Sequence, residues 1–307
     1  MPPRYWIGLD IGGTSIKAGL VDAKARIVHR AEEANVNKGP AQAKEQLIEI
    51  VRAVMPDKKN MVRGIGIGAP GPLDIQKGLL MRCPNIPGWK NVPIVSWLRQ
   101  AFKLPCRMDN DANAAALAES LWGAGKDYRF VFYATLSTGI GTGLVIDKKL
   151  YVGRSGRALE GGHLSIDYKG RQCNCGLKGC IEAYASGPSM VRRALGRLRG
   201  LKNPVTPKSI LQAAQAGNKK AAHLITETGE LLGIWLGNIV NIIEPDVIIL
   251  GGGITNLGDP LFGPIKKTLP RYSIIPYANK IPVVRAHFES DSGILGAAAI
   301  AGCGKSV

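Results

Sequence analysis

The chain contains 307 residues, of which 45% are hydrophobic and 21% are charged. These values are ordinary for a globular protein, and the length exceeds the size at which a single core usually stops growing, so we expect two domains. No apolar run approaches the length of a membrane span and the first residues contain no apolar signal stretch, which argues against a membrane protein and predicts a cytoplasmic one. The formal net charge of +17 indicates either attraction to a polyanion (nucleotide, nucleic acid or polyphosphate) or a solvated basic surface. We interpret the charge as a solvated basic surface where the fold is concerned, and we leave attraction to a polyanion open for the choice of substrate.

Two glycine hairpins are predicted, one in each half of the chain. The first covers residues 5–21 with its turn at 11–14, and the second covers residues 131–146 with its turn at 137–143. Backbone N–H groups in such turns can approach phosphate oxygens, because glycine carries no Cβ that would block them. Either turn alone would be an ordinary hairpin, but the repeated design suggests an internal duplication and favours two phosphate clamps. The Walker pattern and the G-x-G-x-x-G fingerprint are absent, which argues against a P-loop NTPase or a dinucleotide-binding fold.

Between the hairpins, the pattern predicts a helix over residues 41–55 and a strand over 62–68. Two proline-rich loops follow, at 69–74 and 84–89, and the prolines make them stiff enough to form the rim of a binding site. The elements expected next are a helix over 93–102 and a strand over 105–108.

The segment after that strand, D-N-D-A-N-A-A-A from residue 109, is polar and then rich in alanine. It places Asn110 and Asp111 at the N-terminus of a helix, where N–H groups and the helix dipole favour a carboxylate. We therefore expect Asp111 to be ionised at neutral pH. An aspartate in this position is more often a helix cap than a catalyst, so the segment alone leaves its role open.

Three of the six cysteines lie close together in the middle of the chain, ten residues after a histidine. Cys173, Cys175 and Cys180 with His163 offer three thiolates and an imidazole, a closed tetrahedral set that suits zinc and leaves no position for a bound water. The neighbouring glycines allow the short loop to fold back onto one ion. We therefore predict a structural zinc site. The two carboxylates that bracket it are Glu160 and Glu182.

Three other interpretations of these cysteines are weaker. Buried core cysteines would not lie in a segment as polar and glycine-rich as C-x-C-G-x-x-G-C. A disulfide would need an oxidising compartment, which the absence of a signal stretch argues against. An iron–sulfur cluster would usually use four cysteines.

After the cysteine loop, a basic helix is predicted over residues 188–199, and further helices over 208–216 and 219–243. A strand over 246–250 then leads into Gly251-Gly252-Gly253, with another helix behind it. A strand that enters a glycine turn at the start of a helix is typical of nucleotide binding. The chain ends with a strand over 283–288 and a small-residue helix over 294–301.

These motifs resemble those of the ROK family (repressors, open reading frames and kinases), and most of all its bacterial glucokinases. The resemblance covers essentially the whole chain and rests on the run Leu159 to His163, the segment Cys173 to Gly187, and N-D-A-N-A-A-A from residue 110. It implies an α/β, two-domain, actin-like ATPase (sugar kinase) fold with an interdomain cleft and a structural zinc loop. The implied domains are a small N-terminal one of residues 1–110 plus 290–307 and a large one of residues 111–289.

The resemblance also gives each motif a role. Asp111 would be the catalytic base that accepts the proton of the sugar 6-hydroxyl, and His163 would both bind zinc and touch the sugar. The implied sugar-binding residues are Gly71, Asn85, Asn110, Asp111, Glu160, His163 and Glu182. The implied ATP-binding residues are Asp10, Gly12, Gly13, Thr14, Lys17, Thr138 and Gly139, with Gly251, Gly252 and Gly253 at the adenosine. The zinc ligands would be His163, Cys173, Cys175 and Cys180.

The activity that the resemblance implies is that of an ATP-dependent hexokinase of the EC 2.7.1 class, converting glucose to glucose 6-phosphate, with ATP, Mg²⁺ and structural Zn²⁺ as cofactors. Two alternatives are also enzymes: a ROK kinase for fructose, mannose, N-acetylglucosamine or N-acetylmannosamine, and a glucokinase that uses polyphosphate. The third is a sugar-responsive transcription repressor, which would carry a DNA-binding domain ahead of the kinase-like body. Because the first predicted strand already begins at Tyr5, we expect no nucleic-acid partner. We expect a hexose and ATP as ligands, no membrane, and a homodimer or homotetramer.

Overall fold

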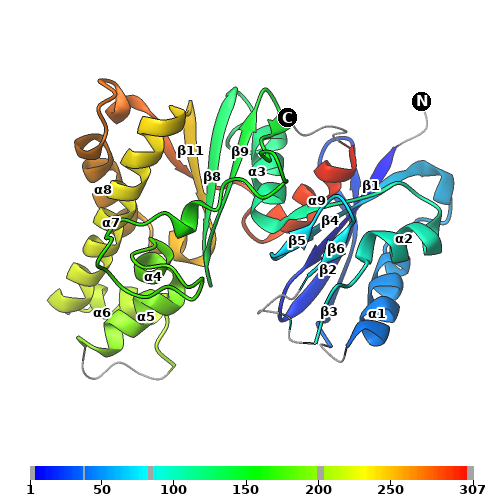
Figure 1. Ribbon diagram of the computed structural model, residues 1–307, viewed down its shortest axis with the longest axis horizontal. Coiled ribbons are helices and arrows are strands. Elements are labelled where there is room, and N and C mark those ends of the chain that lie inside the picture. Colours follow the sequence, from blue (N-terminus) through cyan, green and yellow to red (C-terminus); the bar gives the residue numbers. More distant parts are fainter. Residues whose placement is uncertain (1–3, 37–38, 82–85, 87, 199–203, 303–307) are drawn as a thin grey trace. The chain divides into compact units, whose positions relative to one another are not determined.

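The computed structural model describes most of the chain, which divides into two compact units (Figure 1). The domain boundaries predicted from the sequence, after residue 110 and before residue 290, stay a prediction. The residues described are 4–36, 39–81, 86, 88–198 and 204–302. The first unit comprises Met1–Asp127, Gly143–Ala158 and His287–Val307, and the second comprises Tyr128–Thr142 and Leu159–Ala286.

The first unit contains a five-stranded sheet with the order β3-β2-β1-β4-β7. Strands β1, β2 and β3 are antiparallel neighbours, whereas β4 and β7 run parallel to β1. Helices α1 and α2 cover one face and enclose a core with the apolar side chains of β1, while α3 and α9 pack together near the other face (Figure 1). The strands are β1 (Tyr5–Ile11), β2 (Ser15–Asp22), β3 (Ile27–Ala34), β4 (Val62–Ala69) and β7 (Cys106–Asn110), with a small pair β5 (Leu73–Asp74) and β6 (Leu79–Leu80). The helices are α1 (Pro40–Ala53), α2 (Ile94–Phe102), α3 (Asp111–Trp122) and α9 (Ser292–Gly302).

A second five-stranded sheet has the order β10-β9-β8-β11-β12. It repeats the plan of the first sheet, since β11 runs parallel to both β8 and β12 while β9 and β10 are antiparallel. The strands are β8 (Phe130–Leu136), β9 (Ile140–Ile146), β10 (Lys149–Leu150), β11 (Val247–Gly251) and β12 (Val283–Arg285). The helices of the second unit are α4 (Glu182–Ala185), α5 (Gly187–Leu195), α6 (Pro207–Gln215), α7 (Lys219–Ile243) and α8 (Asp259–Thr268).

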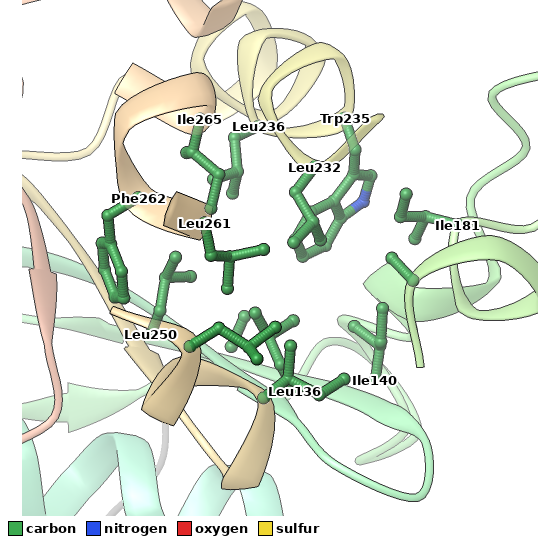
Figure 2. Close-up of a cluster of buried hydrophobic side chains, with 14 of the residues drawn as sticks. Leu136, Ile140, Ile181, Leu232, Trp235, Leu236, Leu250, Leu261, Phe262 and Ile265 are labelled. Atoms are coloured by element: carbon green, nitrogen blue, oxygen red, sulfur yellow. The ribbon is translucent and has the colours of Figure 1, made fainter. Parts of the chain in front are cut away.

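The core of the second unit forms where α7 and α8 pack on β8 and β11. Figure 2 shows apolar side chains from these elements converging, with Trp235 among them and its indole nitrogen on the side of Ile181. The ring of Trp235 meets that of Phe132 edge-on, with centroids 6.0 Å apart. Because this packing also includes Leu136 and Ile140, on either side of the second glycine turn, the turn is mounted on a rigid core.

The predicted α/β class is confirmed, and the predicted helix over 219–243 matches α7 at both ends. The sequence gives no sign of β3, because most of its side chains are exposed and the strand lacks a regular apolar alternation. No helix within the described ranges, not even the 25-residue α7, is long and apolar enough to cross a membrane.

Candidate active site and metal centre

In the first unit, the predicted site residues gather where the parallel strands end. The register pairs Asp10 of β1 with Gly68 of β4, and Gly68 with Asp109 of β7. These strands therefore end at one edge of the sheet, which is where parallel α/β sheets bind ligands. Gly71 and Asn110 meet at this edge, since a Cβ on Gly71 would lie 3.9 Å from the side-chain nitrogen of Asn110. Asn85, also predicted to bind sugar, lies outside the described residues.

Asp10 lies at the end of β1, beside the first turn of α9. A Cβ on Gly293 would lie 2.2 Å from a carboxylate oxygen of Asp10, so only glycine allows the helix this close. Burial raises the pKa of Asp10; the Lys17 ammonium opposes this shift and Glu32 adds to it. Lys17 faces Asp10 across the hairpin, and its Nζ lies 3.8 Å from Glu32. The positive charge of Lys17 is therefore shared between two carboxylates.

The first glycine turn is held by hydrogen bonds from two sides. The amide of Gly12 donates to the carbonyl of Ser15 over 2.9 Å. Asn35 donates twice to the turn, from its side chain to the carbonyl of Gly12 over 2.7 Å and from its backbone to the carbonyl of Thr14 over 2.9 Å. The turn that contains Gly13 is thus fixed by Asn35, a residue beyond the end of β3 that the sequence pattern does not single out.

Asn110 and Asp111 begin helix α3. The side chains of both residues accept a hydrogen bond from the backbone N–H of Ala112, each over 2.8 Å. Asp111 is exposed, and its position at the positive end of the helix dipole favours the ionised carboxylate. The expected capping contact is present, and the role of Asp111 as a base stays a prediction.

The buried carboxylate of Asp109 stabilises the start of α3 through hydrogen bonds. Asp109 is only 4% exposed, and its Oδ1 accepts hydrogen bonds from the backbone N–H of Asn110 over 2.7 Å and from Nδ2 of Asn113 over 2.8 Å. Burial raises the pKa of Asp109, while the two hydrogen bonds oppose that shift. Asp109 therefore ties the end of β7 to the first turn of α3 and fixes the backbone from which Asp111 projects.

In the second unit, two glycine turns follow neighbouring parallel strands. Gly251 at the end of β11 pairs with Thr135 near the end of β8. The turn with Thr138 and Gly139, which follows β8, therefore lies at the same sheet edge as the glycine run after β11. This arrangement brings the predicted phosphate and adenosine contacts of the unit together.

The glycine run after β11 is open on one side and tightly packed on the other. A Cβ on Gly252 would lie 2.4 Å from the carbonyl oxygen of Leu136, whereas Gly253 is exposed and a Cβ there would meet no described atom within 4 Å. The run leads into a 3-10 helix, Gly253–Leu257, and α8 begins only at Asp259. The glycine turn is therefore at the start of a 3-10 helix rather than of the α-helix that the pattern suggests.

The loop that carries Glu160 and His163 is anchored in the core. The Thr142 hydroxyl donates to the carbonyl of Leu159 and accepts from the amide of Gly161 over 3.0 Å. The Trp235 indole N–H donates to the carbonyl of Gly161 over 3.0 Å, so this buried nitrogen has a hydrogen-bond acceptor. Glu160 remains exposed and His163 is half-buried.

His163, Cys173, Cys175 and Cys180 form a cluster that can hold a metal ion. One ligand atom from each of these residues lies within 4.8 Å of all the others. The Sγ atoms of Cys175 and Cys180 are 3.7 Å apart, and Nδ1 of His163 lies 3.8 Å from Sγ of Cys173. A tetrahedral ion with metal–sulfur bonds of about 2.3 Å separates its sulfur ligands by about 3.8 Å, so the spacing fits such an ion. All three cysteines are free, which argues against the disulfide interpretation.

Tight turns bring these four residues together. The amide of Cys173 donates to the carbonyl of Leu177 over 2.8 Å, and that of Gly176 donates to the carbonyl of Cys173 over 3.0 Å. Gly179 has a φ of +77°, and a Cβ there would lie 1.8 Å from the carbonyl oxygen of Asp167. A larger residue could not occupy this position without opening the loop.

The thiols of the metal-free cluster hold their protons tightly. Burial raises the pKa of Cys180 to about 12, and burial also raises the pKa of Cys173. A metal ion binds thiolates, so its arrival must displace these protons. Metal binding by this cluster would therefore be linked to proton release.

Glu182 connects the cysteine loop to the second glycine turn. Its Oε2 accepts a hydrogen bond from the backbone N–H of Ile140 over 2.8 Å, while Oε1 lies 3.9 Å from Sγ of Cys173. A Cβ on Gly139 would lie 2.6 Å from Oε2. The structure thus joins a predicted sugar-binding carboxylate to the turn that is predicted to bind phosphate.

Comparison with known proteins identifies the family. The model of the ROK family matches residues 6–303. The chain belongs to the ROK family. A glucokinase from Thermotoga maritima is 32% identical to it, over 98% of each chain.

Solved ROK structures resemble the whole chain. A ROK hexokinase from Thermus thermophilus is 36% identical with a TM-score of 0.86, covering 98% of each chain. A ROK glucokinase from Streptomyces griseus, solved with glucose and AMPPNP, is 33% identical with a TM-score of 0.82, covering 98% of this chain and all of the other. ROK relatives with another role also match: a xylose repressor from Caldicellulosiruptor bescii is 30% identical over 96% of this chain and 77% of the repressor.

Four supporting residues of this ROK chain do not emerge from its sequence motifs: Asn35, Asp109, Thr142 and Trp235. Each holds a loop that carries predicted site residues, through the hydrogen bonds described above. Two of them have a signal in the sequence, because Asp109 is the first member of the polar triplet before α3 and Thr142 lies within the predicted second turn. Asn35 and Trp235 resemble ordinary loop and core residues.

Proposed function

We propose that this protein is an ATP-dependent hexokinase that transfers the γ-phosphoryl group to the 6-hydroxyl of a hexose, with glucose as its substrate. The observation that carries the proposal is the full-length similarity to a glucokinase solved with glucose and AMPPNP. The two sets of strand-end residues add physical support, since one offers an exposed carboxylate at a helix N-terminus and the other offers a glycine turn beside a metal-binding loop.

In the proposed mechanism, Asp111 accepts the proton of the sugar 6-hydroxyl as that oxygen attacks the γ-phosphorus of ATP. The bond from this phosphorus to the β–γ bridging oxygen breaks, and ADP leaves. Asn110, with Gly71 beside it, contacts the sugar and fixes its position relative to Asp111. Phosphoryl transfer demands mainly positioning and electrostatic stabilisation, which the rigid strand ends provide. Mg²⁺, when bound to the phosphates near Asp10, would spread the negative charge of the transferring group. The half-buried Asp10 carboxyl suits this role, because a nearby cation would favour its ionised form.

ATP would contact both glycine turns and the open glycine run after β11. In the first unit, the N–H groups of Gly12, Gly13 and Thr14 are the proposed phosphate contacts, with the shared charge of Lys17 nearby. In the second unit, Thr138 and Gly139 address phosphate. The exposed face at Gly253 leaves space for adenosine beside Gly251 and Gly252.

Zinc is the metal proposed for the cluster of His163 and the three cysteines. Three thiolates and one imidazole match its preferences, and the complete set leaves no open position for chemistry. Its role is structural, because the ion would hold the loop whose residues Glu160, His163 and Glu182 recognise sugar hydroxyls. With Nδ1 toward the cysteines, the other ring nitrogen of His163 is the one left to address the sugar.

Two alternatives concern the substrates. Another hexose such as fructose, mannose, N-acetylglucosamine or N-acetylmannosamine would use the same machinery and differ at the hydroxyls that Glu160 and Glu182 contact. Polyphosphate as donor draws support from the net charge of +17. However, two arginines of the predicted basic helix have structural partners, since Arg193 and Arg197 both bind Glu227.

The repressor alternative has a specific motivation in the xylose repressor that matches this chain. We favour the kinase, because this chain is 36% identical to a ROK hexokinase and 33% identical to a ROK glucokinase solved with glucose and AMPPNP. A cytoplasmic location, a homodimer or homotetramer, and the domain division at residues 110 and 290 belong to the same proposal.

A coupled assay on a panel of hexoses, run with ATP and with polyphosphate, tests the proposed function. We expect ATP-dependent phosphorylation with glucose giving the highest kcat/KM. A higher kcat/KM for another hexose would reassign the sugar, and turnover with polyphosphate alone would reassign the donor. Absence of turnover with every sugar, together with sugar-dependent binding to DNA in a gel-shift assay, would overturn the kinase proposal in favour of a repressor.

A further inference from the structure

A cavity in the first unit borders β7 and reaches Asp109 near the end of that strand. It has a volume of about 280 Å³ and is bounded by the β5–β6 turn, α2, β7, α3, α9 and the turn between β9 and β10. One wall is tightly built, since a Cβ on Gly78 would lie 2.5 Å from Val95, and the amide of Val95 donates to the carbonyl of Gly78 over 3.3 Å. The cavity is near the lower size limit of pockets that bind small molecules.

The lining of this cavity is strongly cationic. Five basic side chains from four different segments contribute to it, against one carboxylate. So many like charges around one cavity repel each other, and a bound anion would relieve that repulsion. The basic residues are Lys77, Arg99, Arg107, Lys148 and Lys149, and the acidic one is Asp109.

Two of the five cations are already engaged by the protein. Nζ of Lys77 lies 3.7 Å from Asp74. Nζ of Lys148 donates to the carbonyls of Ser120 and Lys126, over 2.7 Å each, and also to that of Gly125. Lys148 therefore braces the cavity wall.

The remaining cations are available to a ligand. Arg107 and Lys149 are exposed, and within the described part of the chain their side chains form no hydrogen bond or ion pair, although their backbones pair within β7 and β10. Arg99 makes a single long contact, from its guanidinium to the carbonyl of Cys106 over 3.4 Å. Two guanidinium groups and an ammonium around one small cavity suit phosphate, because arginine presents parallel N–H donors to two phosphate oxygens.

We propose that this cavity is a binding site for a small phosphate-bearing anion, distinct from the proposed ATP site. The volume admits a diphosphate or a phosphorylated small molecule. Apolar side chains from the surrounding elements complete the walls, so the ligand can also carry a non-polar part. These side chains are Ile75, Val95, Met108, Leu117, Leu150 and Ile300.

The site has a structural connection to the segment that begins α3. Asp109 lines the cavity and also accepts hydrogen bonds from Asn110 and Asn113. A ligand in the cavity therefore meets the carboxylate that fixes the backbone of Asn110 and Asp111. Any effect on catalysis through this contact rests on the proposed function, whereas binding itself does not.

Calorimetric titration with pyrophosphate, without nucleotide or Mg²⁺, tests the proposal. The variant R107E/K149E reverses two cavity charges, and the matched control K44E/R63E makes the same charge change at two exposed residues of the same unit that do not line the cavity. We expect the cavity variant to lose about tenfold or more in pyrophosphate affinity and the control to lose less than about twofold, since the interaction of close charges exceeds that of distant ones. Thermal unfolding of each variant verifies that it is folded.

A second variant tests the space inside the cavity independently of its charge. Ser96→Phe places a large apolar side chain in the lining of the cavity at unchanged net charge, and we expect it to weaken pyrophosphate binding as well. Equal losses in R107E/K149E and K44E/R63E would show general attraction to a basic protein and would overturn the proposal. Unchanged affinity in both cavity variants, or no binding to the wild-type protein at millimolar pyrophosphate, would overturn it too. None of these results depends on kinase activity.

Discussion

Asn110 and Asp111 are positioned by regular secondary structure, whereas Glu160, His163 and Glu182 lie on a loop with little of it. In the first unit, a strand end, a helix start and the buried Asp109 determine where the carboxylate of Asp111 projects. In the second unit, short turns and single hydrogen bonds hold the loop, and four of its residues form a cluster that can hold a metal ion. The position of Asp111 therefore follows from folding alone, whereas we expect a bound ion to add rigidity to the loop of the second unit.

The largest expected effect is the pH dependence of metal binding. Because the pKa of Cys180 is raised to about 12 and that of Cys173 is also raised, both thiols are protonated in the metal-free protein near neutral pH. Binding an ion releases at least these two protons, so affinity should rise by at least about 100-fold per pH unit between pH 6 and 8. Competition with a chelator of known pH dependence measures the slope. A change below about tenfold per unit would show that the thiols are not the ligands.

Removing the proposed base should be next in size. Asp111→Asn keeps a capping oxygen but loses the proton acceptor, so kcat should fall by at least about 100-fold, the usual effect of losing a general base. The KM for sugar and the melting temperature should change little. Steady-state kinetics on a folded, purified variant gives the result. Near-normal kcat would reduce Asp111 to a helix cap and leave the first unit without its proposed chemistry.

Loss of one thiolate should loosen the metal loop selectively. Cys175→Ser should lower the bound zinc from about one ion per chain and raise the KM for sugar about tenfold, with a smaller change in the KM for ATP. Cys175 is exposed, so its replacement leaves no cavity in the core. The control is Cys106→Ser, which removes a cysteine of the first unit and should retain the metal. Elemental analysis measures the bound zinc, and steady-state kinetics measures the two KM values. An unchanged KM for sugar would show that the cluster plays no part in sugar binding.

The smallest effect concerns an anchor of the same loop. Trp235→Phe keeps an aromatic ring against Phe132 but removes the donor to the buried carbonyl of Gly161. The free energy of unfolding should fall by about 1 kcal/mol, the usual net value of one hydrogen bond. The substitution itself removes a tryptophan and so changes the fluorescence signal. Unfolding in denaturant should therefore be followed by circular dichroism. An unchanged midpoint would show that the metal, rather than this anchor, holds the loop.

The sequence is a good guide wherever function requires a local pattern. The glycine turns, the D-N-D-A-N segment and the cysteine loop are each contiguous, so spacing alone brings their residues together. The convergence of His163 with Cys173, Cys175 and Cys180 confirms the predicted cluster. The strand β3 and the pair β5–β6 escape prediction, because short or exposed strands bury too few side chains to leave an apolar pattern.

Local sequence patterns do not reveal residues whose contacts join distant segments of the chain. Trp235 has the pattern of a core residue of α7, and only the fold shows that its nitrogen reaches a loop 74 residues earlier. Glu119 likewise has the sequence pattern of an ordinary helical residue, yet it is fully buried, and its Oε1 accepts hydrogen bonds from the amides of His287 and Phe288. Its contacts fix the segment that leads to α9, and they depend on register between distant segments rather than on composition.

The hydrogen bond from Ile140 to Glu182 has a thermodynamic consequence for substrate binding. A sugar hydroxyl that engages Glu182 shares that carboxylate with the amide of Ile140, which lies directly after the turn of Thr138 and Gly139. With the proposed roles of Glu182 and of this turn, binding of sugar and binding of phosphate in the second unit would therefore be energetically coupled. Coupling of this kind is reciprocal: the factor by which sugar alters nucleotide affinity must equal the factor by which nucleotide alters sugar affinity. One carboxylate would then set the cooperativity between the two substrates.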